Sequence, residues 1–181
     1  MKANNQVKDN KDPKFVKPSR DQRDNREAKP KSEFDEHVLK VDRVSRTVKG
    51  GKRMRFRALV IIGNRNGKIG MGVGKAGEVA EAVAKASTAA KKRILEVPII
   101  NETIPYPIEI SSGASHLILK PAKTGTSVIA GGTVRVIANL AGIRNLVAKS
   151  LGTSNKINNA QTTFTALEKI AKIWKEQNEA K

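Results

Sequence analysis

A set of basic side chains between residues 43 and 75 is suited to one kind of chemistry, which is phosphate binding. Three of them, Arg53, Arg55 and Arg57, alternate with apolar residues and so share one face of a β-strand. Asp42 is the only acidic residue between residues 37 and 77, so almost nothing in the sequence offsets these positive charges. Like charges held together destabilise a fold unless a counter-charge binds, which favours a phosphate-binding surface over a solubilising one. The set comprises Arg43, Arg46, Lys49, Lys52, Arg53, Arg55, Arg57, Lys68 and Lys75.

Glycines accompany these basic residues. The turn at 49–52 contains Gly50 and Gly51, which would let the backbone approach a phosphate closely. A second pattern, Gly72, Gly74 and Gly77, matches G-x-G-x-x-G, with Glu96 nineteen residues further on. Its preceding strand belongs to an antiparallel hairpin, which argues against a dinucleotide site. Close approach of another backbone is the favoured explanation for a row of glycines at Gly67, Gly70, Gly72 and Gly74.

Catalytic and metal-binding residues are sparse. The chain has no cysteine and two histidines, so a zinc site would need carboxylates with His37 or His116. No pair of glutamates has convincing active-site spacing. Trp174 fits the apolar stripe of a C-terminal helix better than a base-stacking platform. We therefore expect a protein that is not an enzyme and that has no metal, cofactor or small-molecule substrate.

Length and charge narrow the class of protein. The 181 residues carry a formal net charge of +18. No apolar run approaches the ~20 residues of a membrane span, and the first ten residues lack the apolar segment of a secretory signal. By segment, the net charge is +4 over residues 1–33, +10 over 34–95 and +4 over 96–181. This concentration predicts a polyanionic partner for the middle segment.

The first 33 residues are predicted to be a disordered charged tail, because they cannot bury enough apolar area to fold. A solubilising role and an RNA-contacting role for this tail remain equal alternatives. Residues 34–95 form the predicted basic RNA-binding domain, with antiparallel strands at 38–48, 53–62 and 67–74 and a helix at about 77–94. The strand face opposite the arginines is expected to hold Met54, Phe56, Ala58, Val60 and Ile62. The expected helix stripe is Val79, Val83, Ala86, Ala90 and Ile94.

Residues 96–175 are predicted to form a second α+β domain with the order β-β-α-β-α, followed by a flexible end at 176–181. Prolines interrupt the strand edges expected within 97–107, and further strands are expected near 108–110, 116–120 and 146–151. The first helix is expected to be capped by Thr133 and ended by Gly142. Ser154 or Asn155 is expected to cap the last helix.

Three motifs of the chain resemble one known family. They are GlyLysArgMetArgPheArgAla at 51–58, the long glycine-punctuated run at 61–76 and IleAlaGlyGlyThrValArg at 129–135. The resemblance is to the bacterial-type family of the fifth protein of the small ribosomal subunit, and it covers roughly residues 36–172. It implies an N-terminal domain resembling a double-stranded-RNA-binding fold and a second α+β domain. The tail at 1–33 departs from the family pattern.

The resemblance also implies a function. It is that of a structural constituent of the small ribosomal subunit that binds ribosomal RNA, supports assembly and translational accuracy, and lies near the messenger RNA entry side. By motif position, Thr47 to Arg53 resembles the family's RNA-contacting hairpin tip. Gly131, Gly132 and Arg135 resemble its contact with the fourth small-subunit protein, and the eighth is a further candidate neighbour. The implied location is cytoplasmic and ribosome-bound, with no membrane partner.

Two other functions remain open. One is a free RNA-binding factor for ribosome assembly or RNA processing, which leaves after acting. The other is a nucleotide-dependent enzyme, which would require the loop at 72–77 to bind a cofactor.

Overall fold

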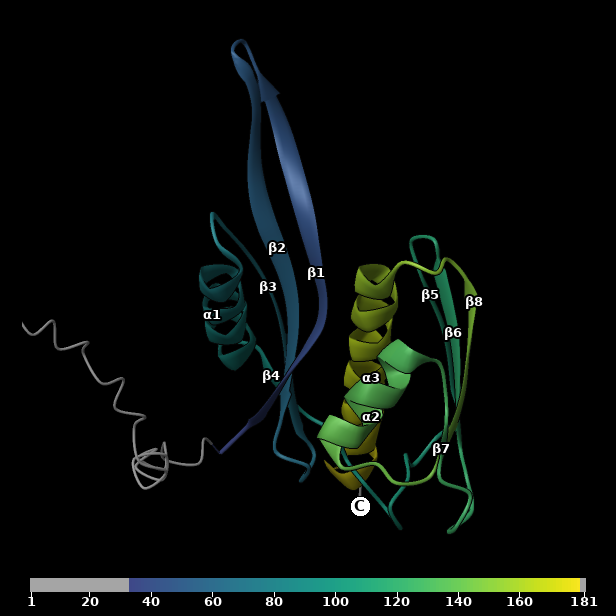
Figure 1. The fold of residues 1–181 in the computed structure, drawn as a ribbon. Helices are drawn as coiled ribbons and strands as arrows, with labels where there is room; N and C mark the ends of the chain where they lie inside the picture. Colours follow the sequence, from purple (N-terminus) through teal and green to yellow (C-terminus); the bar gives the residue numbers. More distant parts are fainter. Residues whose placement is uncertain (1–32, 180–181) are drawn as a thin grey trace, which may run out of the picture. The chain divides into compact units, whose positions relative to one another are not determined.

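The computed structural model describes residues 33–179, and within them lie two four-stranded sheets and three helices (Figure 1). The predicted α+β class, with a sheet-and-helix unit followed by a second α+β unit, is confirmed. The predicted tail lies outside the described residues except for Glu33.

The first sheet is antiparallel throughout, with the strand order β1-β2-β3-β4. All three predicted strands are present, and each is longer than predicted. The helix that follows β3 is shorter than predicted, and Ile94 falls in a short edge strand that periodicity could not reveal. The elements are β1 (Asp35–Val48), β2 (Gly51–Gly63), β3 (Lys68–Ala76), α1 (Val79–Lys91) and β4 (Ile94–Glu96).

A row of glycines in β3 lets α1 pack directly on the strand backbone. A Cβ atom built at Gly70, Gly72 or Gly74 would lie 2.5, 2.1 or 2.3 Å from a carbonyl oxygen of α1. At Gly67 a Cβ would lie 2.8 Å from the carbonyl oxygen of Val97. No side chain fits at these distances, so the prediction that the glycines allow close approach of another backbone is confirmed.

The buried stripe of α1 agrees with the predicted one in part, at Ala86 and Ala90. The residues that face the sheet are alanines, and all three are fully buried: Ala82, Ala86 and Ala90. Val79 and Ile94 were expected in the stripe, yet they are 41% and 42% exposed. The glycine row leaves space only for methyl groups directly between helix and strand, and Val83 packs partly buried beside this contact.

β2 is buried on both faces from Ala58 to Ile62, although one apolar face was predicted. Ala58, Val60 and Ile62 pack in a small core with the alanines of α1. Leu59 and Ile61, on the face that carries the arginines, belong to a larger core shared with the second half of the chain. Met54 was expected on the covered face but is 53% exposed, because the β3 pairing ends at Phe56, before Met54 is reached.

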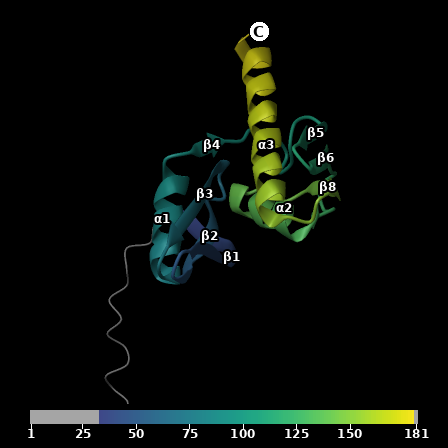
Figure 2. The same ribbon diagram turned by 90° about the horizontal axis from the view of Figure 1, so that it is seen from above.

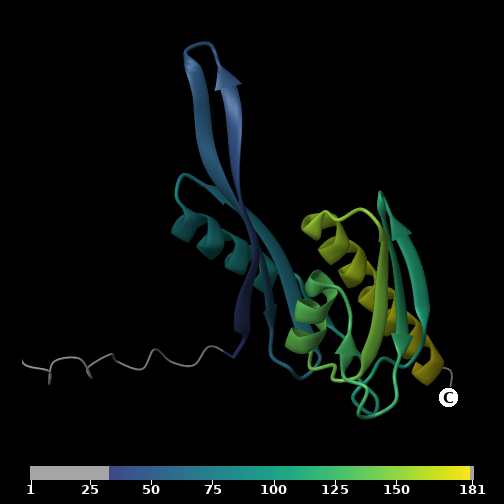
Figure 3. The same ribbon diagram turned by 45° about the vertical axis from the view of Figure 1, so that its right-hand side comes forward.

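The second sheet has the order β5-β6-β8-β7, in which only the short β7 is parallel to its neighbour. The two helices of this half of the chain, α2 and α3, pack on one face of the sheet (Figures 2 and 3). The predicted order of elements is confirmed, with β7 as an addition. The segment 97–107 has only an isolated bridge between Ile100 and Thr103. The elements are β5 (Ile108–Ser112), β6 (Ser115–Pro121), β7 (Val128–Ile129), α2 (Gly132–Ala141), β8 (Leu146–Gly152) and α3 (Lys156–Glu179).

The helix ends agree with the predictions in part. Gly142 ends α2 at a φ of 92°, as expected, but the N-cap is Gly131 and not Thr133, which lies buried inside the helix. Asn155 caps α3, because its Oδ1 accepts a hydrogen bond from the backbone N–H of Ile157 at 3.1 Å. α3 continues to Glu179, so residues 176–179 of the predicted flexible end are helical.

The turn between β2 and β3 is joined to the C-terminal end of α2. The backbone N–H of Arg65 donates to Leu140 O at 2.9 Å, and that of Gly67 donates to Ala141 O at 2.8 Å. These bonds satisfy carbonyl groups that a helix end leaves without intrahelical partners. A Cβ at Gly142 would lie 2.0 Å from the Arg65 carbonyl oxygen, so the contact requires glycine.

Candidate nucleic-acid interface

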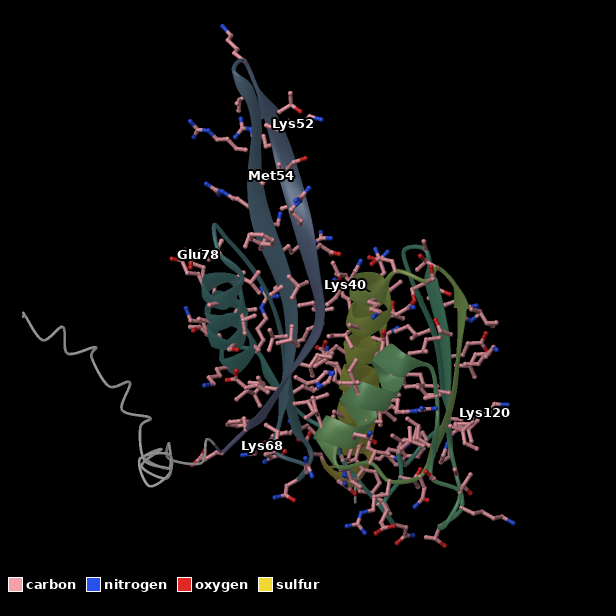
Figure 4. The ribbon with its side chains drawn as sticks, in the orientation of Figure 1. Lys40, Lys52, Met54, Lys68, Glu78 and Lys120 are labelled. Atoms are coloured by element: carbon pink, nitrogen blue, oxygen red, sulfur yellow. The ribbon has the colours of Figure 1, made fainter. Side chains whose placement is uncertain are left out.

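β1 and β2 extend beyond the rest of the first sheet as a two-stranded ribbon. The last β3 residue, Ala76, pairs with Phe56, whereas β1 and β2 continue to pair as far as Val48 and Gly51 (Figure 4). We call residues 43–55 the basic arm. Lys52 and Met54 lie on it in Figure 4, far along the ribbon from Lys68.

The basic arm contains no acidic residue. All of its cationic side chains are exposed, and they are Arg43, Arg46, Lys49, Lys52, Arg53 and Arg55. The register places them on both faces of the ribbon. Arg46 is directly opposite Arg53, and Arg55 follows on the same face, while Arg43 and Lys52 share the other face with Met54. The alternation in the sequence predicts that Arg53, Arg55 and Arg57 share one face of β2. The pairing of β1 with β2 adds Arg46 to the same face.

The turn of the arm is open. A Cβ at Gly50 or Gly51 would have no neighbouring atom within 4 Å. Gly51 has a φ of 141°, a backbone conformation that residues with a side chain rarely adopt. Thr47 and Lys49, which lie near it, are exposed. The backbone here can therefore approach a ligand without steric obstruction.

Arg57 lies at the base of the arm and has a carboxylate partner. Its Nη2 donates to Asp42 Oδ2 at 2.7 Å, and Lys40 Nζ lies 2.9 Å from Asp42 Oδ1. The Lys40 ammonium first, and the Arg57 guanidinium next, lower the pKa of Asp42 below its ordinary value. Arg57 is therefore a less available phosphate ligand than the arginines further along the arm. Lys40 was not among the predicted residues.

Lys75 and Lys68 lie at different places on the first sheet. Lys75 pairs in register with Arg57 and is exposed, so it continues the basic surface at the base of the arm. Lys68 begins β3 at the other end of β2 and forms an ion pair with Glu96 at 3.2 Å. The eleven-residue separation of Lys52 from Gly63 along β2 corresponds to about 37 Å. The structure thus does not bring Lys68 together with the arm.

The three residues assigned to a protein contact lie at the start of α2. Gly131 and Gly132 are exposed, and a Cβ at either would meet nothing within 4 Å. Arg135 is one turn further on and is also exposed. The start of α2 carries no acidic side chain and no side-chain cap, so its first backbone N–H groups lack these partners.

His116 and Trp174, which were considered for catalysis and base stacking, each contact another side chain of the protein. His116 Nε2 lies 2.7 Å from Glu109 Oε1 on the neighbouring strand. Trp174 is half-buried and lies against Tyr106, with a ring-centroid distance of 6.3 Å. Among residues 33–179, no three side chains of the metal-binding types come together. No described helix has the length and apolar character that crossing a membrane requires.

Comparison with known proteins matches both halves of the chain. Residues 34–98 match the model described as "Ribosomal protein S5, N-terminal domain", and residues 111–179 match "Ribosomal protein S5, C-terminal domain". The chain belongs to the ribosomal protein S5 family. The resemblance read from the three motifs is thus confirmed.

Individual relatives agree with this membership. The chain is similar to the small ribosomal subunit protein uS5 of Thermotoga maritima, with 50% identity over 138 residues, 76% of this chain and 78% of the relative. It is 47% identical over 141 residues to the uS5c protein of Cyanophora paradoxa, covering 77% of this chain and 83% of that one. For the uS5 protein of Trichormus variabilis the identity is 44% over 147 residues, with 81% and 84% covered.

Proposed function

We propose that the protein is a structural constituent of the small ribosomal subunit and that it binds ribosomal RNA through the basic arm. Membership of the S5 family, whose relatives carry the name small ribosomal subunit protein, supports the ribosomal part of the proposal. The observation that carries the RNA-binding part is the arm itself, a ribbon with six cationic side chains and no acidic one.

The geometry of the arm favours contacts to phosphates over contacts to base edges. A-form RNA has a deep, narrow major groove that side chains do not read, so duplex RNA is recognised by its backbone and shape. Cations on both faces of a thin ribbon can contact two phosphate chains at once. The open turn at Gly50 and Gly51 adds backbone N–H groups at the tip. The proposed RNA contacts are made by the six cationic residues of the arm, by Thr47, Gly50 and Gly51 near its tip, and by Arg57 and Lys75 at its base.

The remaining parts of the proposal concern the surroundings of the protein. Gly131, Gly132 and Arg135 form an exposed surface at the start of α2 that is suited to a neighbouring ribosomal protein, notably the fourth of the small subunit. We further propose a ribosome-bound protein of the cytoplasm that supports subunit assembly and translational accuracy near the messenger entry side. The division of the described chain near residue 96 into two domains also remains a proposal.

Sedimentation distinguishes a resident constituent from a factor that leaves. The tagged full chain is expressed in bacterial cells, and the small subunits are separated on a sucrose gradient at moderate salt. A resident constituent is recovered with mature small subunits at one copy per particle. Recovery only with immature particles would instead identify a free assembly factor. The Arg53→Gln, Arg55→Gln variant should be recovered at lower occupancy, whereas Lys169→Gln, an exposed cation on α3, should match the unaltered chain.

A further inference from the structure

Asn66 and Gly67 form the only Asn-Gly pair in the sequence, and they lie in the turn between β2 and β3. Asn66 is exposed. An asparagine that precedes glycine loses its side-chain amide more readily than one that precedes any other residue, because glycine has no side chain to hinder attack by its own backbone nitrogen. The pair is therefore a candidate site of spontaneous deamidation.

Deamidation at such a pair has two steps. The backbone nitrogen of Gly67 gives up its proton to solvent base and attacks Cγ of Asn66, and the bond from Cγ to Nδ2 breaks with release of ammonia. The five-membered imide that results then takes up one water molecule. Opening at Cγ leaves an aspartyl residue, whereas opening at the main-chain carbonyl carbon leaves an isoaspartyl linkage, whose main chain is one atom longer. The first step requires the N–H group of Gly67 to be free.

In the folded chain this N–H group is occupied. Gly67 is buried, and its N–H donates to Ala141 O at 2.8 Å, at the C-terminal end of α2. Its carbonyl oxygen accepts from the N–H of Val97, also at 2.8 Å. A Cβ at Gly67 would lie 2.8 Å from the Val97 carbonyl oxygen, so there is little room for Gly67 to move. Two segments far apart in sequence therefore hold the attacking nitrogen away from the Asn66 side chain.

The rest of the turn is also hydrogen-bonded. Asn64 Oδ1 accepts from the backbone N–H groups of Asn66 and Lys68 at 2.8 and 3.0 Å. Arg65 N donates to Leu140 O at 2.9 Å, although Arg65 has a φ of 58°, a conformation that persists only where surrounding contacts impose it. Because closing the imide ring changes the backbone at Asn66, the turn must separate from α2 before the reaction begins.

We propose that Asn66 is a deamidation site protected by the contact between this turn and α2, so that the modification marks chains in which the contact has opened. Local openings of a folded protein free backbone N–H groups without global unfolding, and their free energies differ from one region to another. The frequency of such openings sets the rate of a reaction that needs a free N–H group. The inference is independent of RNA binding, because it uses none of the residues of the basic arm.

The product of the reaction would weaken the contact that protects the site. An isoaspartyl linkage lengthens the main chain immediately before Gly67, whose N–H and carbonyl groups are both hydrogen-bonded. The turn and α2 already fit closely, since a Cβ at Gly142 would lie 2.0 Å from the Arg65 carbonyl oxygen. The longer chain therefore impairs reclosure of the turn on α2, and the modified protein is expected to be less stable.

The first test follows deamidation of the full chain in mildly alkaline buffer, with and without urea. Mass spectrometry measures the conversion of amide to carboxylate in the peptide that contains Asn66. A carboxyl methyltransferase specific for isoaspartyl groups measures the isoaspartyl product. The rate in urea should exceed the rate in the folded chain at least about 10-fold. Asn66→Gln should give no conversion at this position, because glutamine would have to form a less favourable six-membered ring.

A second test opens the contact without denaturant. Gly142→Ala places a Cβ against the Arg65 carbonyl oxygen and should raise the rate in buffer at least about 5-fold. Gly77→Ala is the matched control, because a Cβ there meets nothing within 4 Å, and it should react like the unaltered chain. Asn64→Ala removes the side-chain acceptor within the turn and should also accelerate the reaction, so the test holds even if Gly142→Ala fails to fold.

Three results would overturn the proposal: no conversion in urea, equal rates in the folded and unfolded chains, or equal rates for Asn64→Ala and Gly77→Ala. The loss of stability is tested by incubating the unaltered chain and Asn66→Gln in urea, refolding both and comparing their melting temperatures. The melting temperature of the unaltered chain should fall as deamidation proceeds, while that of Asn66→Gln stays constant. A melting temperature that stays constant in both chains would contradict the weakened contact.

Discussion

Arg46 and Arg53 face each other directly across the β1–β2 ladder, with no acidic residue in the arm around them. Like charges in this position destabilise a pair of strands. Nothing in the described part of the first sheet packs over this pair, since β3 ends at the partner of Phe56. The arm therefore carries a charge arrangement that disfavours its own folding in isolation and that an RNA phosphate chain would relieve.

Replacing one member of this pair should change stability and RNA binding in opposite directions. Arg53→Gln should raise the free energy of unfolding by a few tenths of a kcal/mol, up to ~1 kcal/mol, because the repulsion is removed. It should weaken binding to small-subunit ribosomal RNA about 5- to 10-fold at about 100 mM salt. Urea unfolding and filter binding measure the two effects. Lys169→Gln on α3 is the control. An equal loss of RNA affinity in this variant would contradict RNA binding by the basic arm.

The glycine row of β3 predicts that adding a methyl group to one of these glycines lowers the stability of the protein. Gly72→Ala should lower the free energy of unfolding by at least about 2 kcal/mol, because its Cβ would lie 2.1 Å from the Ala86 carbonyl oxygen. Gly77→Ala is the matched control, since a Cβ there meets nothing within 4 Å, and it should be neutral or stabilise by about 0.4–1 kcal/mol. Equal stabilities of the two variants, measured by thermal or urea unfolding, would show that close packing does not explain the row.

Ser127 predicts a substitution that stabilises the protein. Its φ of 67° is a conformation that costs an L-residue roughly 1 kcal/mol and costs glycine little. Ser127→Gly should therefore raise the melting temperature, while Ser127→Ala, which keeps the strain, should not. The gain will be smaller than the strain because glycine is also more flexible in the unfolded chain. Calorimetry on the two variants checks the sign, and a lower melting temperature for the glycine variant would contradict it.

The pairing of Asp42 predicts how stability depends on pH. Lys40 and Arg57 lower the pKa of Asp42 in the folded state, so between that value and the ordinary value near 3.9 the unfolded chain binds more protons. The stabilisation is thus complete above about pH 5 and is lost as the pH falls through the lowered pKa. The stability difference between the unaltered chain and Asp42→Asn should be constant from about pH 5 to 7 and shrink below about pH 4. A difference that does not vary with pH would contradict the ion pair.

The elements that sequence reasoning identified are those with strong local patterns. The alternation from Met54 to Ile62 and the glycine punctuation of 67–74 gave the first sheet, and Gly142 marked the end of α2. The stripe of α1 was predicted correctly at Ala86 and Ala90, but Val79 and Ile94 at its two ends were wrongly expected inside. Only the contact with the glycines makes alanine the residue that fits. The second buried face of β2, with Leu59 and Ile61, depends on packing against elements more than forty residues away.

The basic arm could be predicted because its charges are close in sequence. Sequence alone did not show that Lys68, on the same sheet, lies at the other end of β2 from the arm. Arg57 also could not be distinguished from Arg53 by sequence, because its partner Asp42 is brought opposite it only by the strand register. The ion pair between Arg144 and Glu102 joins residues that are forty-two positions apart, so no local pattern could reveal it.

Salt dependence of RNA binding tests the central claim most directly. The affinity of the full chain for small-subunit ribosomal RNA is measured between about 50 and 200 mM salt, for the unaltered chain and for Arg53→Gln with Arg55→Gln. If the arm neutralises about six phosphates, affinity falls roughly 10³-fold over this range, and the variant shows a shallower slope by about 1.8. An affinity that hardly changes with salt, or equal slopes for the two proteins, would contradict phosphate binding by the arm.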